Sequence, residues 1–292
     1  MEQVGLGSRG MIVRFDARDG VALAGLLSRG HRHSPTCIIF VHGMMGSMTS
    51  SVSLALHGHI GRGFDVFSIN TRGAGMVSGF SRKLGNGRTR RYTIGTCMER
   101  FEDCVHDIGG AVDAARRMGY RRVVLCGHST GCQKIAYYQY RMRDRRVGAL
   151  VLVAPADDYN IARKRLGTGI GRIRNACTRM MSSGKGNAVA PDTSGFSAQR
   201  LDSILDPGRA EARMFNYDGD LGEFACIKIP VLAVFGSEEE NAPRPVAQCL
   251  ERLSMVSGSR RFDAMLVEGA DHNFHGMGKA LAATICKWLA YG

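Results

Sequence analysis

Short apolar runs alternate with amphipathic stretches along most of the chain. Runs at 36–41, 64–69 and 122–126 are typical of buried strands, and residues 99–118 repeat apolar side chains at helical spacing. This alternation predicts an α/β fold, with a mostly parallel sheet flanked by helices. The other expected strands are 11–15, 21–27, 149–154, 231–235 and 261–267, and the other expected helices are 51–60, 132–140, 246–254 and 277–290.

The alternation lapses between about residues 157 and 228, which are rich in Arg, Gly, Ser and Asp. The sheet pattern resumes afterwards, so this stretch is expected to be an inserted cap rather than a separate domain. The predicted organisation is a core of residues 1–156 and 229–292 with a cap at 157–228. A polar, basic stretch from 76 to about 95 is expected to be a long loop.

Composition limits where the protein works and what it binds. The 292 residues are 44% hydrophobic and 22% charged, as in globular domains, and no apolar run is long enough to span a bilayer. Residues 1–10 contain no apolar segment of the secretory type. We therefore expect a cytoplasmic protein that does not enter membranes.

Charge and cysteine content argue against two further classes of function. The net charge is +13, but it is dispersed, and no basic motif interleaved with aromatic residues is present, so nucleic acid is not an expected partner. The nine cysteines are irregularly spaced and form no Cys-x-x-Cys pair. They are expected to be reduced, mostly buried thiols, and no metal site is predicted.

The pentapeptide Gly127-His128-Ser129-Thr130-Gly131 lies between an expected strand and an expected helix. A strand, a sharp Gly-x-Ser-x-Gly turn and a helix form a nucleophile elbow, which raises the serine hydroxyl above the sheet. The two glycines lack the side chains that would clash where strand and helix meet. Ser129 is therefore the predicted nucleophile, with Gly127 and Gly131 as structural support.

A serine hydroxyl needs a base, and the base needs an orienting carboxylate. His272, in the loop after the last expected strand, is the predicted base; His275 is its nearest rival but lies closer to the following helix. His128, inside the elbow, is expected to pack or to form hydrogen bonds.

The acid is expected just after the strand at 231–235, where the chain reads Gly236-Ser237-Glu238-Glu239-Glu240. Glu239 is the first choice, Glu238 the second and Glu240 the third. The side chain of Asp271 is expected to diverge from that of its neighbour His272.

Two backbone N–H groups are needed to stabilise an oxyanion. One is expected from Thr130, which follows the nucleophile. The other is expected from Met44 in the loop that begins His42-Gly43-Met44, where the glycine permits a tight turn.

These motifs together resemble the α/β-hydrolase superfamily over essentially the whole chain. The matching segments are His42-Gly43, Arg72-Gly73-Ala74-Gly75, Gly127 to Gly131, and the acid and histidine loops. The chain departs from the usual pattern at Asn70, where many members carry aspartate, and in the glutamate offered as acid.

Four further segments are similar to a hydrolase family that includes fungal siderophore esterases. The resemblance implies hydrolysis of an ester bond, in a hydroxamate-type siderophore or a similar polar ester. The segments are Gly127 to Gln133, Glu99 to Asp103, Ala154 to Asp158 and Phe196 to Arg200.

The predicted function is that of a serine esterase that acts on a small-molecule ester and needs no cofactor. A serine peptidase or amidase, an acyltransferase, or a non-catalytic ligand-binding protein of the same fold are the alternatives. The cap is expected to select the substrate. Its arginines either favour an anionic or polar acyl group or form a solvated surface, and they lie at 163, 165, 172, 174, 179 and 200. The sequence indicates neither the natural ester and its chain length nor the oligomeric state.

Overall fold

The structure, a computed structural model, describes residues 10–30, 34–59, 63–191, 193 and 195–291. Within these ranges, eight strands form one sheet in the order β1-β2-β4-β3-β7-β8-β9-β10. The first two strands pair antiparallel, and the strands from β4 to β10 run parallel. The strands are β1 (Gly10–Asp16), β2 (Ala22–Ser28), β3 (Thr36–Val41), β4 (Asp65–Ile69), β7 (Arg122–His128), β8 (Val147–Val153), β9 (Val231–Gly236) and β10 (Phe262–Val267).

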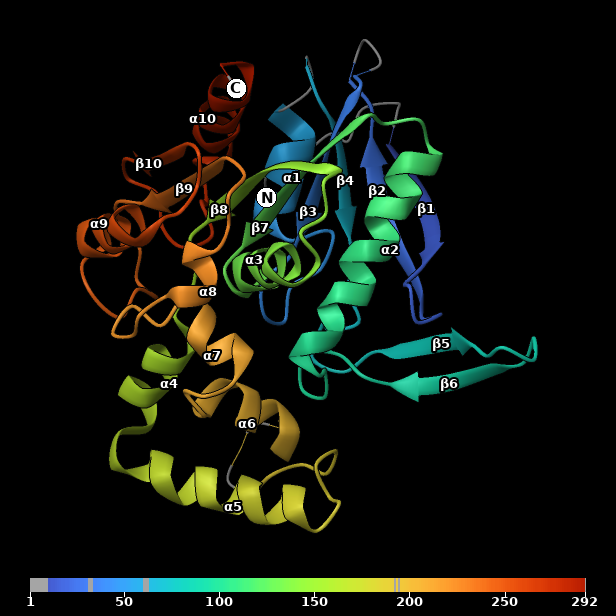
Figure 1. The fold of residues 1–292 in the computed structure, drawn as a ribbon, viewed down its shortest axis with the longest axis vertical. Helices are drawn as coiled ribbons and strands as arrows, with labels where there is room; N and C mark the ends of the chain where they lie inside the picture. Colours follow the sequence, from blue (N-terminus) through green and yellow to red (C-terminus); the bar gives the residue numbers. More distant parts are fainter. Residues whose placement is uncertain (1–9, 31–33, 60–62, 192, 194, 292) are drawn as a thin grey trace.

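Helices cover the sheet, with α2 packed against α3 and α1 against α10 (Figure 1). The parallel strands β3, β7, β8 and β9 are almost entirely buried, as expected for a sheet covered on both faces. This architecture confirms the fold class predicted from the alternating pattern. The helices are α1 (Ser51–His59), α2 (Cys104–Arg117), α3 (Thr130–Met142), α9 (Val246–Val256) and α10 (Gly278–Ala290).

The chain between β8 and β9 forms helices that lie beyond one end of the sheet, below it in Figure 1. We call residues 157–228 the helical segment. It contains α4 (Asp158–Leu166), α5 (Ile170–Ser182), α6 (Ala198–Leu205), α7 (Ala210–Met214) and α8 (Gly222–Ala225). Its first part has an apolar cluster distinct from the main core, made of Ile173, Cys177, Ala190, Ala198, Leu201, Ile204 and Leu205. Its last part packs into the main core through Met214, Phe215, Tyr217, Leu221, Phe224 and Ile227.

The register of the sheet brings several strand ends together. Val41 of β3 pairs with Gly127 of β7, Gly127 pairs with Leu152 of β8, and Leu152 pairs with Ala233 of β9. The carboxyl ends of the parallel strands therefore lie along one edge, where α/β proteins form their ligand sites. The loops that carry the expected site residues all leave the sheet at this edge.

Two sequence predictions were wrong in detail. The stretch from 76 to 95 is not an irregular loop, since β5 (Gly79–Lys83) and β6 (Thr89–Thr93) pair as an antiparallel hairpin. Its strands are largely exposed, so no buried face marks them in the sequence. The helix expected from residue 99 begins at Cys104, after a short 3₁₀ helix at Phe101–Asp103.

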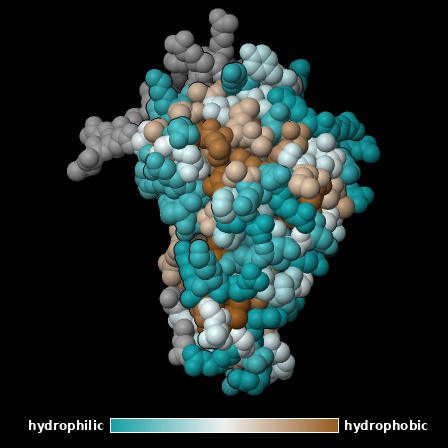
Figure 2. Space-filling view, turned by 90° about the vertical axis from the view of Figure 1, so that its left-hand side faces the viewer, coloured by the Kyte–Doolittle hydropathy of each residue, from teal (hydrophilic) through white to brown (hydrophobic). Residues whose placement is uncertain are grey.

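The surface view in Figure 2 shows a face on which hydrophilic residues predominate and hydrophobic residues are gathered in separate patches. In the described part of the chain, no helix has the length and apolar character needed to cross a membrane. All nine cysteines carry free thiols, and only Cys226 is classed as exposed.

Candidate active site

Ser129 occupies the sharp turn between β7 and α3. Its backbone φ of 54° and ψ of −127° lie outside the regions that residues with a side chain ordinarily adopt. Strain of this kind persists only where the surrounding structure enforces it, and it is concentrated at functional sites. The turn places Ser129 at the carboxyl edge of the sheet and at the N-terminus of α3, where the helix dipole favours negative charge.

Close backbone contacts explain the glycines around this serine. A Cβ atom on Gly127 would lie 2.5 Å from the backbone of Gly131, and a Cβ on Gly131 would lie 2.2 Å from the Val41 carbonyl oxygen. A Cβ on Gly43 would lie 2.8 Å from the Cβ of Ser129. The strand, the helix and the loop after β3 can therefore meet at Ser129 only because these positions carry no side chain.

His272 and Glu239 form a buried pair beside this turn. His272 Nδ1 lies 2.7 Å from Glu239 Oε1 and 2.9 Å from Oε2, and the two side chains are 11% and 1% exposed. A carboxylate only accepts hydrogen bonds, so Nδ1 carries the hydrogen and Nε2 is left able to accept a proton. Glu240 instead accepts the backbone N–H of His272 at 3.0 Å, and Glu238 is exposed.

The histidine loop is fastened to the serine turn through His128. Its Nε2 lies 2.9 Å from the His272 carbonyl oxygen, and the two rings are 4.9 Å apart between centroids. Burial, with a smaller contribution from nearby His272, lowers the pKa of His128 to about 3. The ring is therefore neutral near neutral pH, and its Nε2–H donates to the carbonyl. Among the described residues, no hydrogen bond joins the Ser129 hydroxyl to His272, and such contacts are often long in free enzymes.

His275 has a different partner. Its Nδ1 lies 2.7 Å from Asp271 Oδ2, and its side chain is 66% exposed. Asp271 also accepts the backbone N–H groups of Asn273 and His275. The structure therefore places Asp271 with His275, and it places Glu239 with His272.

The N–H groups of Met44 and Thr130 lie on the two chain segments that meet at Ser129. Neither donates a hydrogen bond to another described residue. Thr130 is the first residue of α3, and its hydroxyl donates to Asp158 Oδ2 at 2.9 Å. Met44 follows Gly43, where an added Cβ atom would lie 2.8 Å from the Cβ of Ser129. The arrangement leaves two backbone donors available next to the serine.

His42 fixes the loop that carries Met44. Its Nε2 accepts the backbone N–H of Thr71 at 3.2 Å, so its Nδ1 carries the hydrogen and donates to the Gly43 carbonyl oxygen at 2.8 Å. Burial, reinforced by the nearby Lys134 ammonium, lowers the pKa of His42 to about 4. A neutral imidazole can then act as donor and acceptor at once, which ties the loop after β3 to the loop after β4.

The loop after β4 is itself anchored by a buried arginine. The Arg72 guanidinium contacts Asp107 at 2.8 Å, Asp19 at 2.9 Å and Asp103 at 3.1 Å. At the start of this loop, Asn70 Oδ1 accepts the backbone N–H of Met48 at 2.7 Å. The amide thus supplies an acceptor at the position where the resemblance led us to expect aspartate.

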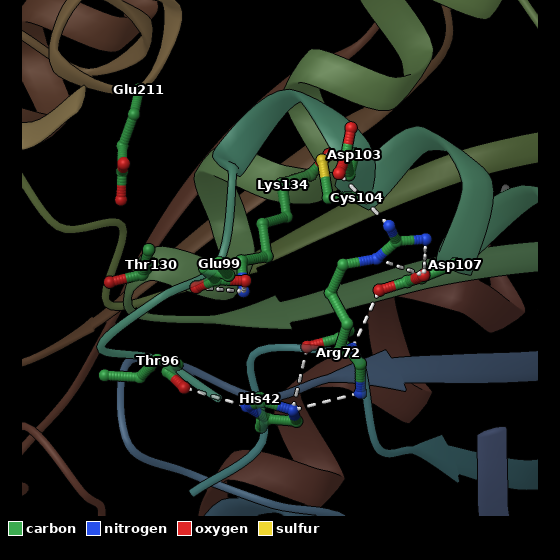
Figure 3. Close-up of polar contacts among 12 residues, drawn as sticks. His42, Arg72, Thr96, Glu99, Asp103, Cys104, Asp107, Thr130, Lys134 and Glu211 are labelled. Atoms are coloured by element: carbon green, nitrogen blue, oxygen red, sulfur yellow. Dashed lines mark hydrogen bonds and ion pairs between the residues drawn. The ribbon is translucent and has the colours of Figure 1, made fainter. Parts of the chain in front are cut away.

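A second group of buried charges joins α3 to α6 and was not predicted from the sequence. Lys134 Nζ lies 2.7 Å from Glu99 Oε2, and Arg200 of α6 contacts both Glu211 and, at 3.7 Å, Glu99. Figure 3 shows Lys134 and Glu99 facing each other near Thr130. Burial disfavours the charge on Glu99, but Lys134 and Arg200 outweigh it and hold its pKa below the ordinary value.

The arginines of the helical segment have mixed environments. Arg200 is fully buried, whereas Arg163 and Arg174 are partly exposed and pair with Asp218 and Asp206. Paired or buried guanidinium groups are less available to a substrate than free ones. The sequence could not separate these cases, because the partners lie far along the chain.

A family model described as alpha/beta hydrolase family matches residues 38–284. No curated protein sequence matches the chain. Within the described ranges, no group of three or more His, Cys, Asp or Glu side chains is placed to hold a metal ion.

Several solved structures are similar in fold. Est1E from Butyrivibrio proteoclasticus has a TM-score of 0.60 and 15% identity, covering 96% of this chain and 98% of its own. Carboxylesterase CesB from Bacillus subtilis has a TM-score of 0.56 and 17% identity, covering 97% and 93%. A soluble variant of monoglyceride lipase from Saccharomyces cerevisiae has a TM-score of 0.64 and 13% identity, covering 99% and 97%.

Proposed function

Because the chain belongs to the alpha/beta hydrolase family, we propose that it is a serine hydrolase that cleaves a carboxylic ester through an acyl-enzyme. The observation that carries this proposal is the buried His272–Glu239 pair beside the strained turn of Ser129. The carboxylesterase and the lipase among the proteins of similar fold support the same reaction class.

In the proposed mechanism, Ser129 Oγ attacks the ester carbonyl carbon while His272 Nε2 takes the hydroxyl proton. Glu239 orients the imidazole through Nδ1 and offsets the positive charge that forms on the ring. The imidazolium then gives its proton to the departing alkoxide, which leaves as an alcohol. In the second half of the reaction, His272 Nε2 takes a proton from water as the water oxygen attacks the acyl carbonyl carbon. The imidazolium then returns the proton to Ser129 Oγ, and the carboxylic acid is released.

The tetrahedral intermediate carries a negative oxygen, for which we assign two donors. The N–H groups of Met44 and Thr130 pair with no other described residue and lie on the two segments that meet at Ser129. Donors fixed in place before the reaction stabilise developing charge without reorganisation, and one such donor contributes about 10²–10³ to kcat.

We propose that the helical segment acts as a cap over this site and selects a small-molecule ester. It lies beyond the edge of the sheet to which Ser129 belongs (Figure 1), and the Met44 side chain packs against its apolar cluster. The burial of Arg200 leaves the more exposed arginines of this segment as the candidates for contact with a polar acyl group.

The test is hydrolysis of a series of chromogenic esters, from acetyl to dodecanoyl, by the wild type and by Ser129→Ala. We expect turnover by the wild type, none by Ser129→Ala, and full turnover by the control Ser182→Ala, an exposed serine of α5. Matched anilides in the same series separate esterase from amidase activity, and an added alcohol reveals acyl transfer.

Two outcomes would overturn the proposal. Equal rates for the wild type and Ser129→Ala would show that another group is responsible. Absence of turnover together with absence of fluorophosphonate labelling at Ser129 would indicate a ligand-binding protein without this chemistry.

A further inference from the structure

A short segment, residues 96–98, lies between the helical segment and the loop that carries Met44. We propose that Thr96 in this segment is a positioning residue that couples the placement of the helical segment to the oxyanion donor of Met44. This inference rests on the proposed function, because it concerns how the same site is held in its active geometry.

On one side, Thr96 holds the loop after β3. Its Oγ1 accepts the backbone N–H of Met45 at 3.0 Å, and its own N–H donates to the Gly75 carbonyl oxygen at 2.9 Å. The Gly75 N–H donates in turn to the Gly46 carbonyl oxygen at 3.0 Å. The loop is thus held at two successive residues, Met45 and Gly46, directly after the proposed donor.

Met45 needs this support. Its φ of 59° is in the left-handed region, which costs energy for a residue with a side chain, and its side chain is largely exposed. Side-chain packing therefore contributes little to holding Met45 in this conformation. The hydrogen bond to Thr96 Oγ1 holds the peptide between Met44 and Met45 from outside the loop. Within the loop, the Gly46 N–H donates to the Gly43 carbonyl oxygen at 3.1 Å and closes the turn that contains Met44.

On the other side, the same segment is fastened to α6. The Arg200 Nε–H donates to the Thr96 carbonyl oxygen at 3.0 Å, and the backbone N–H of Ser197 donates to the Cys97 carbonyl oxygen at 2.8 Å. The Gln199 side-chain amide donates to the Met98 carbonyl oxygen at 2.9 Å. Three successive carbonyl groups thus receive hydrogen bonds from the start of one helix.

The Arg200 contact is firmly placed because this guanidinium is wholly buried and ion-paired with Glu211. The side chain of Met44 packs against the cluster that includes residues of α6. Both the side chain and the backbone of the Met44–Met45 stretch are therefore held relative to α6. A displaced helical segment would release the donor, so only the docked arrangement is fully active.

The test compares Thr96→Val, which replaces the hydroxyl with a methyl group of similar size, with Thr96→Ser, which keeps the hydroxyl. Thr178→Val is the matched control, since its hydroxyl bonds within exposed α5. Two readouts are measured: kcat and KM on the best ester, and the rate of fluorophosphonate labelling of Ser129, which depends on the same oxyanion donors but needs no matched substrate. Thermal unfolding shows whether each variant is folded.

We expect Thr96→Val to lose at least about tenfold in kcat and in labelling rate with KM little changed, because a misplaced donor weakens only the transition state. Thr96→Ser should recover most of the loss, and Thr178→Val should match the wild type. If Thr96→Val does not fold, Thr96→Ala, which leaves room for water at the Met45 N–H, replaces it with the same expectation.

Wild-type kcat and labelling rate in folded Thr96→Val or Thr96→Ala, with Ser129→Ala inactive, would overturn the coupling and leave the proposed function intact. A loss seen only in KM would also overturn it, since that would indicate a role in substrate binding. Activity that persists in Ser129→Ala would instead overturn the proposed function itself.

Discussion

Three buried histidines should make this fold sensitive to mild acid. Burial lowers the pKa of His42 and His57 to about 4 and that of His128 to about 3, against an ordinary value near 6.5. Their residues are at most 8% exposed. Both ring nitrogens of His57 contact serine hydroxyls: Nδ1 lies 2.8 Å from Ser28 Oγ, and Nε2 lies 2.9 Å from Ser68 Oγ. Neutral hydroxyls cannot offset the positive charge of a protonated imidazole.

The sign follows from proton binding. Between about pH 6.5 and 4, the unfolded chain protonates these rings and the folded chain does not, so the stability present above pH 6.5 is lost as pH falls. Each ring contributes about 1.4 kcal/mol per pH unit, so the three together give a slope of about 4 kcal/mol per unit. At about pH 5 the loss is about 6 kcal/mol, which is comparable to the whole stability of many domains.

The measurement is the free energy of unfolding in urea at several values from about pH 7.5 to 5, for the wild type and His57→Gln. Glutamine can still form hydrogen bonds to both serines but does not titrate, so it should reduce the slope by about one third. Buried carboxyls with raised pKa values, such as Asp107 and Glu211, change the free energy of unfolding with pH in the opposite direction. They are present in both proteins, so they do not affect the difference between the two slopes. The same slope in both proteins, or a stability that does not change with pH, would refute the reasoning.

Two further predictions concern the site. Glu239→Gln should lower kcat by about 10³–10⁴, because the amide no longer orients the imidazole or offsets its charge. Glu240→Gln should retain most activity, because Glu240 accepts from the His272 backbone N–H and the Asn241 side chain and does not contact the ring of His272; ester kinetics of the two variants decide this. Gly131→Ala should destabilise the fold by several kcal/mol, since its Cβ would press on backbone at 2.2 Å, while the control Gly171→Ala in α5, with open space around it, should raise the melting temperature slightly. An unchanged melting temperature for Gly131→Ala would contradict the close packing at the elbow.

The sheet could be predicted from the sequence because its strands are short apolar runs buried on both faces. The run at 36–41 coincides with β3. The hairpin of β5 and β6 was missed because its side chains are mostly exposed and polar, although Asn86-Gly87 marks a turn between the strands. Periodicity reports burial, so it cannot detect a ladder that buries no face.

For the site, chain order and loop position were enough to select candidates, but their selection stays a prediction until kinetics are measured. The three adjacent glutamates show the limit: the backbone path of one loop decides that Glu239, and neither neighbour, contacts the ring of His272. The pairing of Lys134 with Glu99 lay beyond sequence reasoning altogether. It joins residues far apart in the chain, and charged side chains are expected outside the core.

The position of β10 at one edge of the sheet has a consequence for how this protein loses activity. The loop that carries His272 leaves β10, which is half exposed and among the described strands pairs with β9 alone, whereas Ser129 follows a central, almost fully buried strand. Edge elements detach at a lower free-energy cost than central ones. On heating, the proposed base His272 would separate from the proposed nucleophile Ser129 while the centre of the sheet is still intact, so inactivation would precede melting and would reverse on cooling.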